Sequence, residues 1–282
     1  MGLRVRQVRQ LLGLATATAF CALLSGAEPD LPALVHTEPL RLGPSQPEFR
    51  MIRLAYDDNA MGYGGFGRRG RSWTTDAPEA EFHLTQGIRR LTRIDTFDPG
   101  NDADWDDVYP LEPLDDELFS HPFLYAVEVG RWYLNDEQAA KIREYLLRGG
   151  FLMVDDFHGS LQWEGFMESM RRIFPDREVV EIPDGHEVFH VVWDLNEVVS
   201  GPHKVQIPGL AALYNGTTYE QDGVEPHWRG VFDDDGRLMV AINFNMDLGD
   251  AWEQADNPQY PEKYTALAYR IGSSYAIYSM TH

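Results

Sequence analysis

Cysteine is almost absent from this sequence. The 282 residues contain one, Cys21, and it lies in an N-terminal segment (residues 1–27) with the layout of a secretory signal peptide. Removal of that segment would leave a mature chain with no disulfide, no thiolate nucleophile and no cysteine metal ligand. Mechanisms that need a catalytic cysteine are therefore excluded for the mature chain.

The N-terminal segment lacks a hydrophobic run long enough to span a bilayer. Arginines precede an apolar run from Leu11 to Leu24, which is shorter than the roughly 20 residues of a membrane-spanning helix. Ser25 and Ala27 occupy the −3 and −1 positions of a cleavage site. We therefore expect export to the periplasm or the medium and no membrane span in the mature form. Retention of the segment as an anchor is the alternative.

Basic residues are also scarce. Lysine and arginine number 24 against 45 aspartates and glutamates, which gives a formal net charge of −21. Such an acidic body repels nucleic acid and anionic lipid. The charge excludes a nucleic-acid partner, and it leaves a small molecule or an envelope protein as the expected partner.

The remaining chain divides into a spacer and one domain. Residues 28–48 hold five prolines, which is typical of an extended spacer rather than packed structure. Residues 49–282 alternate between predicted strands and helices, and this order predicts an α/β fold with a mostly parallel sheet. The predicted strands are 49–56, 123–129, 151–154, 178–182 and a hairpin over 231–243 with an Asp-Gly turn. The predicted helices are 76–91 with Asp76 as its cap, one that begins with an Asn135–Gln138 capping box and ends at Gly149, one around 163–170, and 264–280.

The clearest candidate site follows the strand at 151–154. Asp155, Asp156 and His158 stand where that strand should give way to a helix, at the carboxyl edge where α/β proteins bind ligands. These side chains could form a metal site or an acid–base pair, completed by His186 or Asp247. Alternatively, Asp156 or His158 caps the next helix and the others bind loop backbone.

A second candidate site is a glycine-rich loop. Gly62–Gly67 matches GxGxxG, but no helix begins directly after it, so a dinucleotide site is disfavoured. Glycine amides next to arginines favour an anion instead. The predicted ligand-binding residues are Arg68, Arg69, Arg71, Trp73, Asp76 and Asp247.

Two metal motifs fit poorly. His186–His190 matches HExxH, but its flanking residues favour a turn and strand, whereas a zinc protease needs a helix there. Asp102, Asp104 and Asp106 alternate as in a calcium loop, but the glycine and the glutamate of an EF-hand are missing.

Several short motifs together resemble the domain-of-unknown-function 4159 family over roughly residues 49–282. They are the glycine loop with residues 73–76, Gly149–Leu152, Asp155–Asp156, the His186 turn, Gly236–Arg237 and Asp247–Gly249. The resemblance implies a class I glutamine amidotransferase-like fold, which is a flavodoxin-like three-layer α/β/α sandwich, and no settled activity. In true amidotransferases a cysteine nucleophile occupies the turn that here holds Asp155–Gly159.

Three functions remain open from the sequence. The first is an exported, non-catalytic binding or scaffold domain without a cofactor. The second is a metal-assisted hydrolase of a carbohydrate or an ester, with one divalent ion bound by Asp155, Asp156, His158 and His186. The third is an aspartate nucleophile at Asp155 or Asp156 with His158 as its base.

Overall fold

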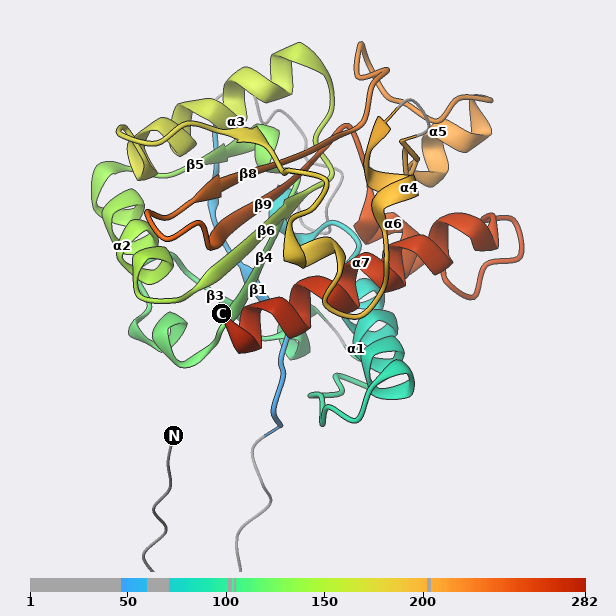
Figure 1. The fold of residues 1–282 in the computed structure, drawn as a ribbon, viewed down its shortest axis with the longest axis horizontal. Coiled ribbons are helices and arrows are strands. Elements are labelled where there is room, and N and C mark those ends of the chain that lie inside the picture. The colour runs from blue at the N-terminus through green and yellow to red at the C-terminus, as the bar shows by residue number, and fades with distance from the viewer. Residues whose placement is uncertain (1–46, 60–70, 101–102, 104, 202–203) are drawn as a thin grey trace, which may run out of the picture. The chain divides into compact units, whose positions relative to one another are not determined.

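The computed structural model describes residues 47–59, 71–100, 103, 105–201 and 204–282, and they belong to a compact unit that starts at residue 46 (Figure 1). The predicted signal peptide, nearly all of the spacer and the glycine-rich loop lie outside these residues. Within the described part of the chain, no helix is both long and apolar enough to cross a membrane.

A seven-stranded sheet forms the centre of the fold, in the order β3-β1-β4-β6-β9-β8-β7. The first five strands of this order are parallel, whereas β8 and β7 are antiparallel to their neighbours. The strands are β1 (Ile52–Leu54), β3 (Pro110–Leu111), β4 (Phe123–Val127), β6 (Phe151–Asp155), β7 (Val180–Glu181), β8 (His227–Phe232) and β9 (Leu238–Phe244). A separate antiparallel pair joins β2 (Asp57–Asp58) and β5 (Trp132–Tyr133). The predicted mostly parallel sheet with a C-terminal hairpin is confirmed.

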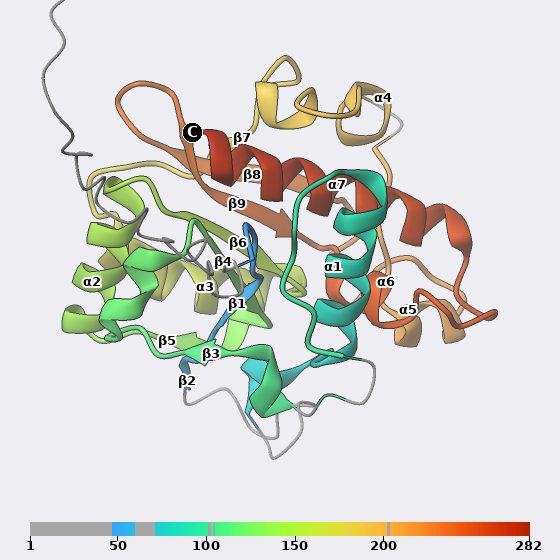
Figure 2. The same ribbon diagram turned by 90° about the horizontal axis from the view of Figure 1, so that it is seen from below.

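Helices cover both faces of the sheet and make three layers (Figure 2). One core cluster contains residues of α1 (Glu79–Leu91), α6 (Leu248–Glu253) and α7 (Glu262–Thr281), and the other contains residues of α2 (Asp136–Leu147) and α3 (Gly159–Ile173). Successive residues of β4 alternate between the two clusters, because side chains of a strand point to opposite faces. Two short helices, α4 (Asn196–Val199) and α5 (Leu210–Tyr214), lie in the long connection between β7 and β8.

Local signals fix the βαβ unit from β4 to β6. The Asn135 side chain accepts a hydrogen bond from the Gln138 amide, and the Gln138 side chain accepts one from the Asn135 amide, each at 2.9 Å. This is the predicted capping box. Gly149 ends the helix with φ +108°. The helix at 76–91 differs from the prediction, since it begins at Glu79 with Pro78 at its N-cap, and Asp76 does not cap it.

Helix α3 packs on the turn after β4 so closely that only glycine fits at residue 165. A Cβ at Gly165 would lie 2.2 Å from the carbonyl oxygen of Gly130. We expect Gly165→Ala to lower the free energy of unfolding by about 1–3 kcal/mol, because backbone must move to relieve the overlap. Urea denaturation measures this loss. Gly185→Ala is the control, since no heavy atom lies within 4 Å of its Cβ position.

Candidate functional site

Acidic side chains gather at the carboxyl edge of the sheet. Asp156 follows β6, Asp247 follows β9 closely, and Asp76 comes from the turn before α1. Helix α6 adds two more carboxylates. We call this group the carboxylate cluster: Asp76, Asp156, Asp247, Asp250 and Glu253.

The cluster contains two sets of three oxygen ligands. One oxygen each from Asp76, Asp156 and Asp247 lie within 4.8 Å of one another, and so do one oxygen each from Asp76, Asp250 and Glu253. Asp76 is common to both sets. Carboxylate oxygens are the ligands that Ca²⁺ and Mg²⁺ prefer, so each set has the chemistry of a hard-cation site.

A buried arginine holds the segment that carries Asp76. Arg53 Nη1 donates to the carbonyl oxygens of Trp73 at 2.9 Å and Thr75 at 2.6 Å. The Asp76 Oδ2 atom is buried and has no hydrogen-bond partner among the residues that the structure describes. It lies against the backbone of Gly249, where an added Cβ would come within 2.1 Å of it. A carboxylate oxygen left without a donor in this place favours a cation as its missing partner.

Helix α6 is anchored by two aspartates with different tasks. Asp247 caps the helix, and its Oδ1 accepts from the Asp250 amide at 2.7 Å. Asp155 is fully buried, and its Oδ2 accepts from the amides of Leu248 at 2.7 Å and Gly249 at 2.9 Å. Asp155 therefore holds the N-terminus of α6 in place, whereas Asp247 also contributes to the cluster.

Asp156 contacts His158, as their proximity in sequence suggested. His158 Nε2 lies 3.1 Å from Asp156 Oδ1, and His158 is 3% exposed. Neither caps α3 through its side chain: Asp222 accepts from the Ser160 amide at 2.8 Å instead. The expectation that Asp156 or His158 caps this helix was wrong, because a residue 62 positions away in the sequence supplies the cap.

Backbone strain also concentrates at this edge. Asp76, Glu128, Asp156 and Asn245 adopt left-handed conformations, with φ of +63°, +55°, +51° and +62°. Non-glycine residues in this region are strained, and such residues cluster at functional sites. The surrounding contacts thus hold these side chains in positions that relaxed backbone would not give.

Burial and mutual repulsion raise the pKa of these carboxyls. Burial is the main cause at Asp76 and Asp247, whose pKa values lie well above the usual range, and the charges of Asp250 and Asp156 add to it. Burial and the charge of Asp156 raise the pKa of Asp155. Burial raises the pKa of Asp250 to about 8 and that of Glu128 to about 9. Without a cation, part of the edge therefore keeps its protons at neutral pH.

His186 does not join these residues. Its ring packs on Phe232 and Tyr278, with centroids 5.3 and 5.7 Å away, and Phe232 pairs with Leu238 at the start of β9. Asp155 lies level with the other end of β9, five residues after Leu238, which is roughly 17 Å away at about 3.3 Å per residue. The predicted four-residue metal set with His186 is therefore not assembled. The segment after His186 is a 3-10 turn (Glu187–Phe189), neither the predicted strand nor the helix of a zinc protease.

The predicted ligand-binding residues are scattered. Asp76 and Asp247 belong to the carboxylate cluster. Trp73 is 3% exposed and packs in the core, while exposed Arg71 lines a separate small cavity with it. Arg68 and Arg69 lie outside the described residues, as do Asp102 and Asp104 of the acidic loop.

Sequence reasoning missed Glu128 and Glu253 at this edge. Asp250 and Glu253 are one helical turn apart on α6, and Glu128 directly follows β4. The signal for Glu128 was available, since it lies within one residue of the end of the predicted strand 123–129. Asp250 belongs to the segment 247–252 after the last strand, which the sequence indicated as lining the same edge.

Comparison with known proteins places the chain in a family. The family model described as "Domain of unknown function (DUF4159)" matches residues 51–280. A search of curated proteins finds no match. Because the family model covers nearly all of the described residues, the chain belongs to the DUF4159 family.

Proposed function

We propose that this chain is an exported, amidotransferase-like domain that binds a divalent cation in the carboxylate cluster and holds a ligand there. One observation carries the proposal: oxygens of Asp76, Asp156 and Asp247 lie within 4.8 Å of one another. The layout of residues 1–27 supports export. The hydrolase hypothesis from the sequence also had a divalent ion, but its ligands were Asp155, Asp156, His158 and His186. The binding domain that the sequence favoured had no cofactor, and a bound cation is now added to it.

Electrostatics supports a cation here. Among the described residues, no lysine or arginine forms an ion pair with any member of the cluster; the ion pair of Asp156 is with His158. Buried carboxylates without a positive partner repel one another and are poorly solvated. A divalent ion would relieve both effects at once.

Cation binding is tested directly by calorimetry. We expect Ca²⁺, Mg²⁺ or Mn²⁺ to bind the full chain, and Asp247→Asn to weaken that binding at least about tenfold, because a charged ligand is lost while the helix cap is kept. Asp235→Asn is the control, since Asp235 is exposed and lies in the β8–β9 turn. Absence of binding of any of these ions at millimolar concentration, or equal weakening by the two substitutions, would contradict the proposal.

A second candidate function is metal-assisted hydrolysis of an ester or a carbohydrate. The Asp156–His158 contact favours it. Asp156 would help to hold the cation, which would supply Lewis acidity, and the neighbouring His158 imidazole would serve as the proton acceptor. Within the described part of the chain, the His158 Nδ1 atom has no hydrogen-bond partner. Turnover of model esters or glycosides that is lost both in chelator and in His158→Gln would support hydrolysis over binding alone.

A further inference from the structure

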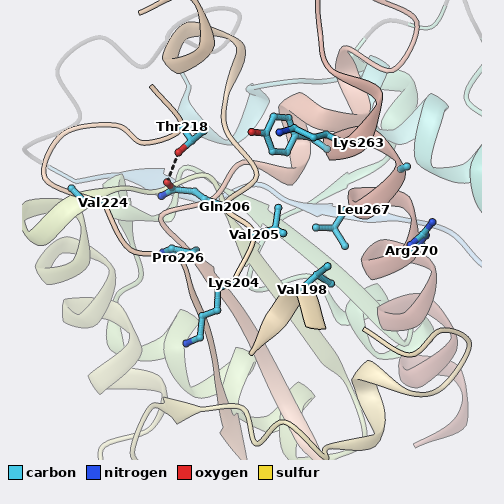
Figure 3. Close-up of a pocket in the computed structure, with 12 residues that line it drawn as sticks. Val198, Lys204, Val205, Gln206, Thr218, Val224, Pro226, Lys263, Leu267 and Arg270 are labelled. Carbon is cyan, nitrogen blue, oxygen red and sulfur yellow. Dashed lines mark hydrogen bonds between the residues drawn. The ribbon is translucent and has the colours of Figure 1, made fainter. Parts of the chain in front are cut away.

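A pocket beside α7 lies away from the carboxylate cluster. Its volume is about 610 Å³, within the range of roughly 300–1,000 Å³ that is typical of small-molecule sites. Figure 3 shows Val198, Val205 and Leu267 near its centre. Tyr264 and Pro226 add to an apolar lining, which suits the body of an organic molecule.

The pocket is lined by positive charge, whereas the chain as a whole is negatively charged. Lys204, Lys263 and Arg270 line it, and no aspartate or glutamate among the described residues does. Lys204 and Arg270 lie on opposite sides of the apolar centre (Figure 3). In a chain with 45 acidic and 24 basic residues, a pocket with three cations and no carboxylate is selective for negative charge.

Among the described residues, no strong ion pair neutralises the three cations. Lys204 Nζ lies 3.7 Å from Glu181 Oε2, which is half-exposed, and such a pair contributes little. The Lys263 ammonium lies 4.5 Å from the centre of the Tyr264 ring, and the Arg270 guanidinium lies 5.9 Å from that of Trp193. Both contacts leave their positive charge available to an anion.

We propose that this pocket binds a small organic anion with an apolar body, its carboxylate or phosphate held by Lys204, Lys263 or Arg270. The site is separate from the carboxylate cluster, because the chain at Gln206 and Ile207 runs between them. Gln206 Nε2 donates to the carbonyl of Asn245 at 2.9 Å, and Ile207 accepts from the Asp247 amide at 2.9 Å.

Octanoate is a suitable probe, with octanol and octylamine as matched neutral and cationic molecules. Calorimetry on the full chain in chelator keeps the measurement independent of any cation. We expect octanoate to bind at least about tenfold more tightly than octanol, since one charge-assisted contact is worth about that factor, and octylamine not to bind. Equal binding of octanoate and octanol, or no binding of octanoate, would overturn the proposal.

Substitutions locate the binding. The double variant Lys204→Gln/Arg270→Gln should weaken octanoate binding at least about tenfold. Ala266→Trp should abolish it, because Ala266 is a half-buried lining residue and the larger ring fills the pocket. Arg171→Gln is the control, since Arg171 is exposed on α3 and does not line the pocket. Octanoate binding that survives Ala266→Trp in a folded variant would place the anion elsewhere and refute the assignment.

Discussion

Replacement of Arg53 by methionine is expected to lower the free energy of unfolding by about 3–5 kcal/mol. The Arg53 side chain is 0% exposed and that of Glu81 is 3% exposed, and Arg53 Nε lies 2.5 Å from Glu81 Oε1. Removal of the arginine leaves a buried carboxylate without its charge partner and two carbonyl oxygens, those of Trp73 and Thr75, without a donor. Urea denaturation of the single variant measures the loss.

The double variant Arg53→Met/Glu81→Met separates charge from packing. It removes both buried charges, so it should recover much of the stability that the single variant loses. Equal instability of the two variants would show that lost packing or the lost carbonyl contacts, and not the unpaired carboxylate, caused the effect.

The double variant also tests whether Arg53 positions Asp76 for cation binding. Arg53 holds the carbonyls of Trp73 and Thr75, and the adjacent Asp76 is the ligand common to both oxygen sets. We infer that the double variant, although folded, binds a divalent cation more weakly than the wild type, because its Asp76 is no longer fixed. Arg53 is thus a positioning residue and does not itself bind the ion.

The elements that local chemistry specifies were predictable from the sequence. The Asn135 capping box, the Gly149 helix stop and the Asp-Gly turn of the last hairpin each act within a few residues, and each is present. Because the carboxyl ends of parallel strands meet at one edge of the sheet, the sequence also indicated that Asp156 and Asp247 lie together.

The rest of the site depends on contacts between distant segments. Asp76 was expected to cap a helix, but Arg53 and Gly249, both far away in the sequence, set its surroundings. His186 was placed with the site because it resembled a metal ligand, yet its ring packs on Phe232 beside the start of β9, at the end of that strand opposite to Asp155. The residue types in a motif do not show at which end of the strands a long connection between them will lie.

The raised carboxyl pKa values predict an unusual dependence of stability on pH. Burial raises the pKa of Asp250 from 3.8 to about 8 and that of Glu128 from 4.5 to about 9. The folded state therefore keeps protons that the unfolded chain has released, and stability is greatest below the unfolded pKa values and is lost as pH rises through the folded ones. Between about pH 5 and pH 8, each such group lowers the free energy of unfolding by up to about 1.4 kcal/mol per pH unit.

This dependence should appear only when divalent ions are absent. In chelator we expect urea denaturation to give a more stable protein at pH 5 than at pH 8, and Asp250→Asn to flatten the slope, whereas Asp235→Asn should leave it unchanged. A saturating cation should stabilise the protein more at pH 8 than at pH 5, because at pH 5 it must displace protons from its own ligands. Stability in chelator that rises from pH 5 to pH 8 would mean that the carboxyls are already ionised without an ion, and the electrostatic reason for a cation at this edge would be lost.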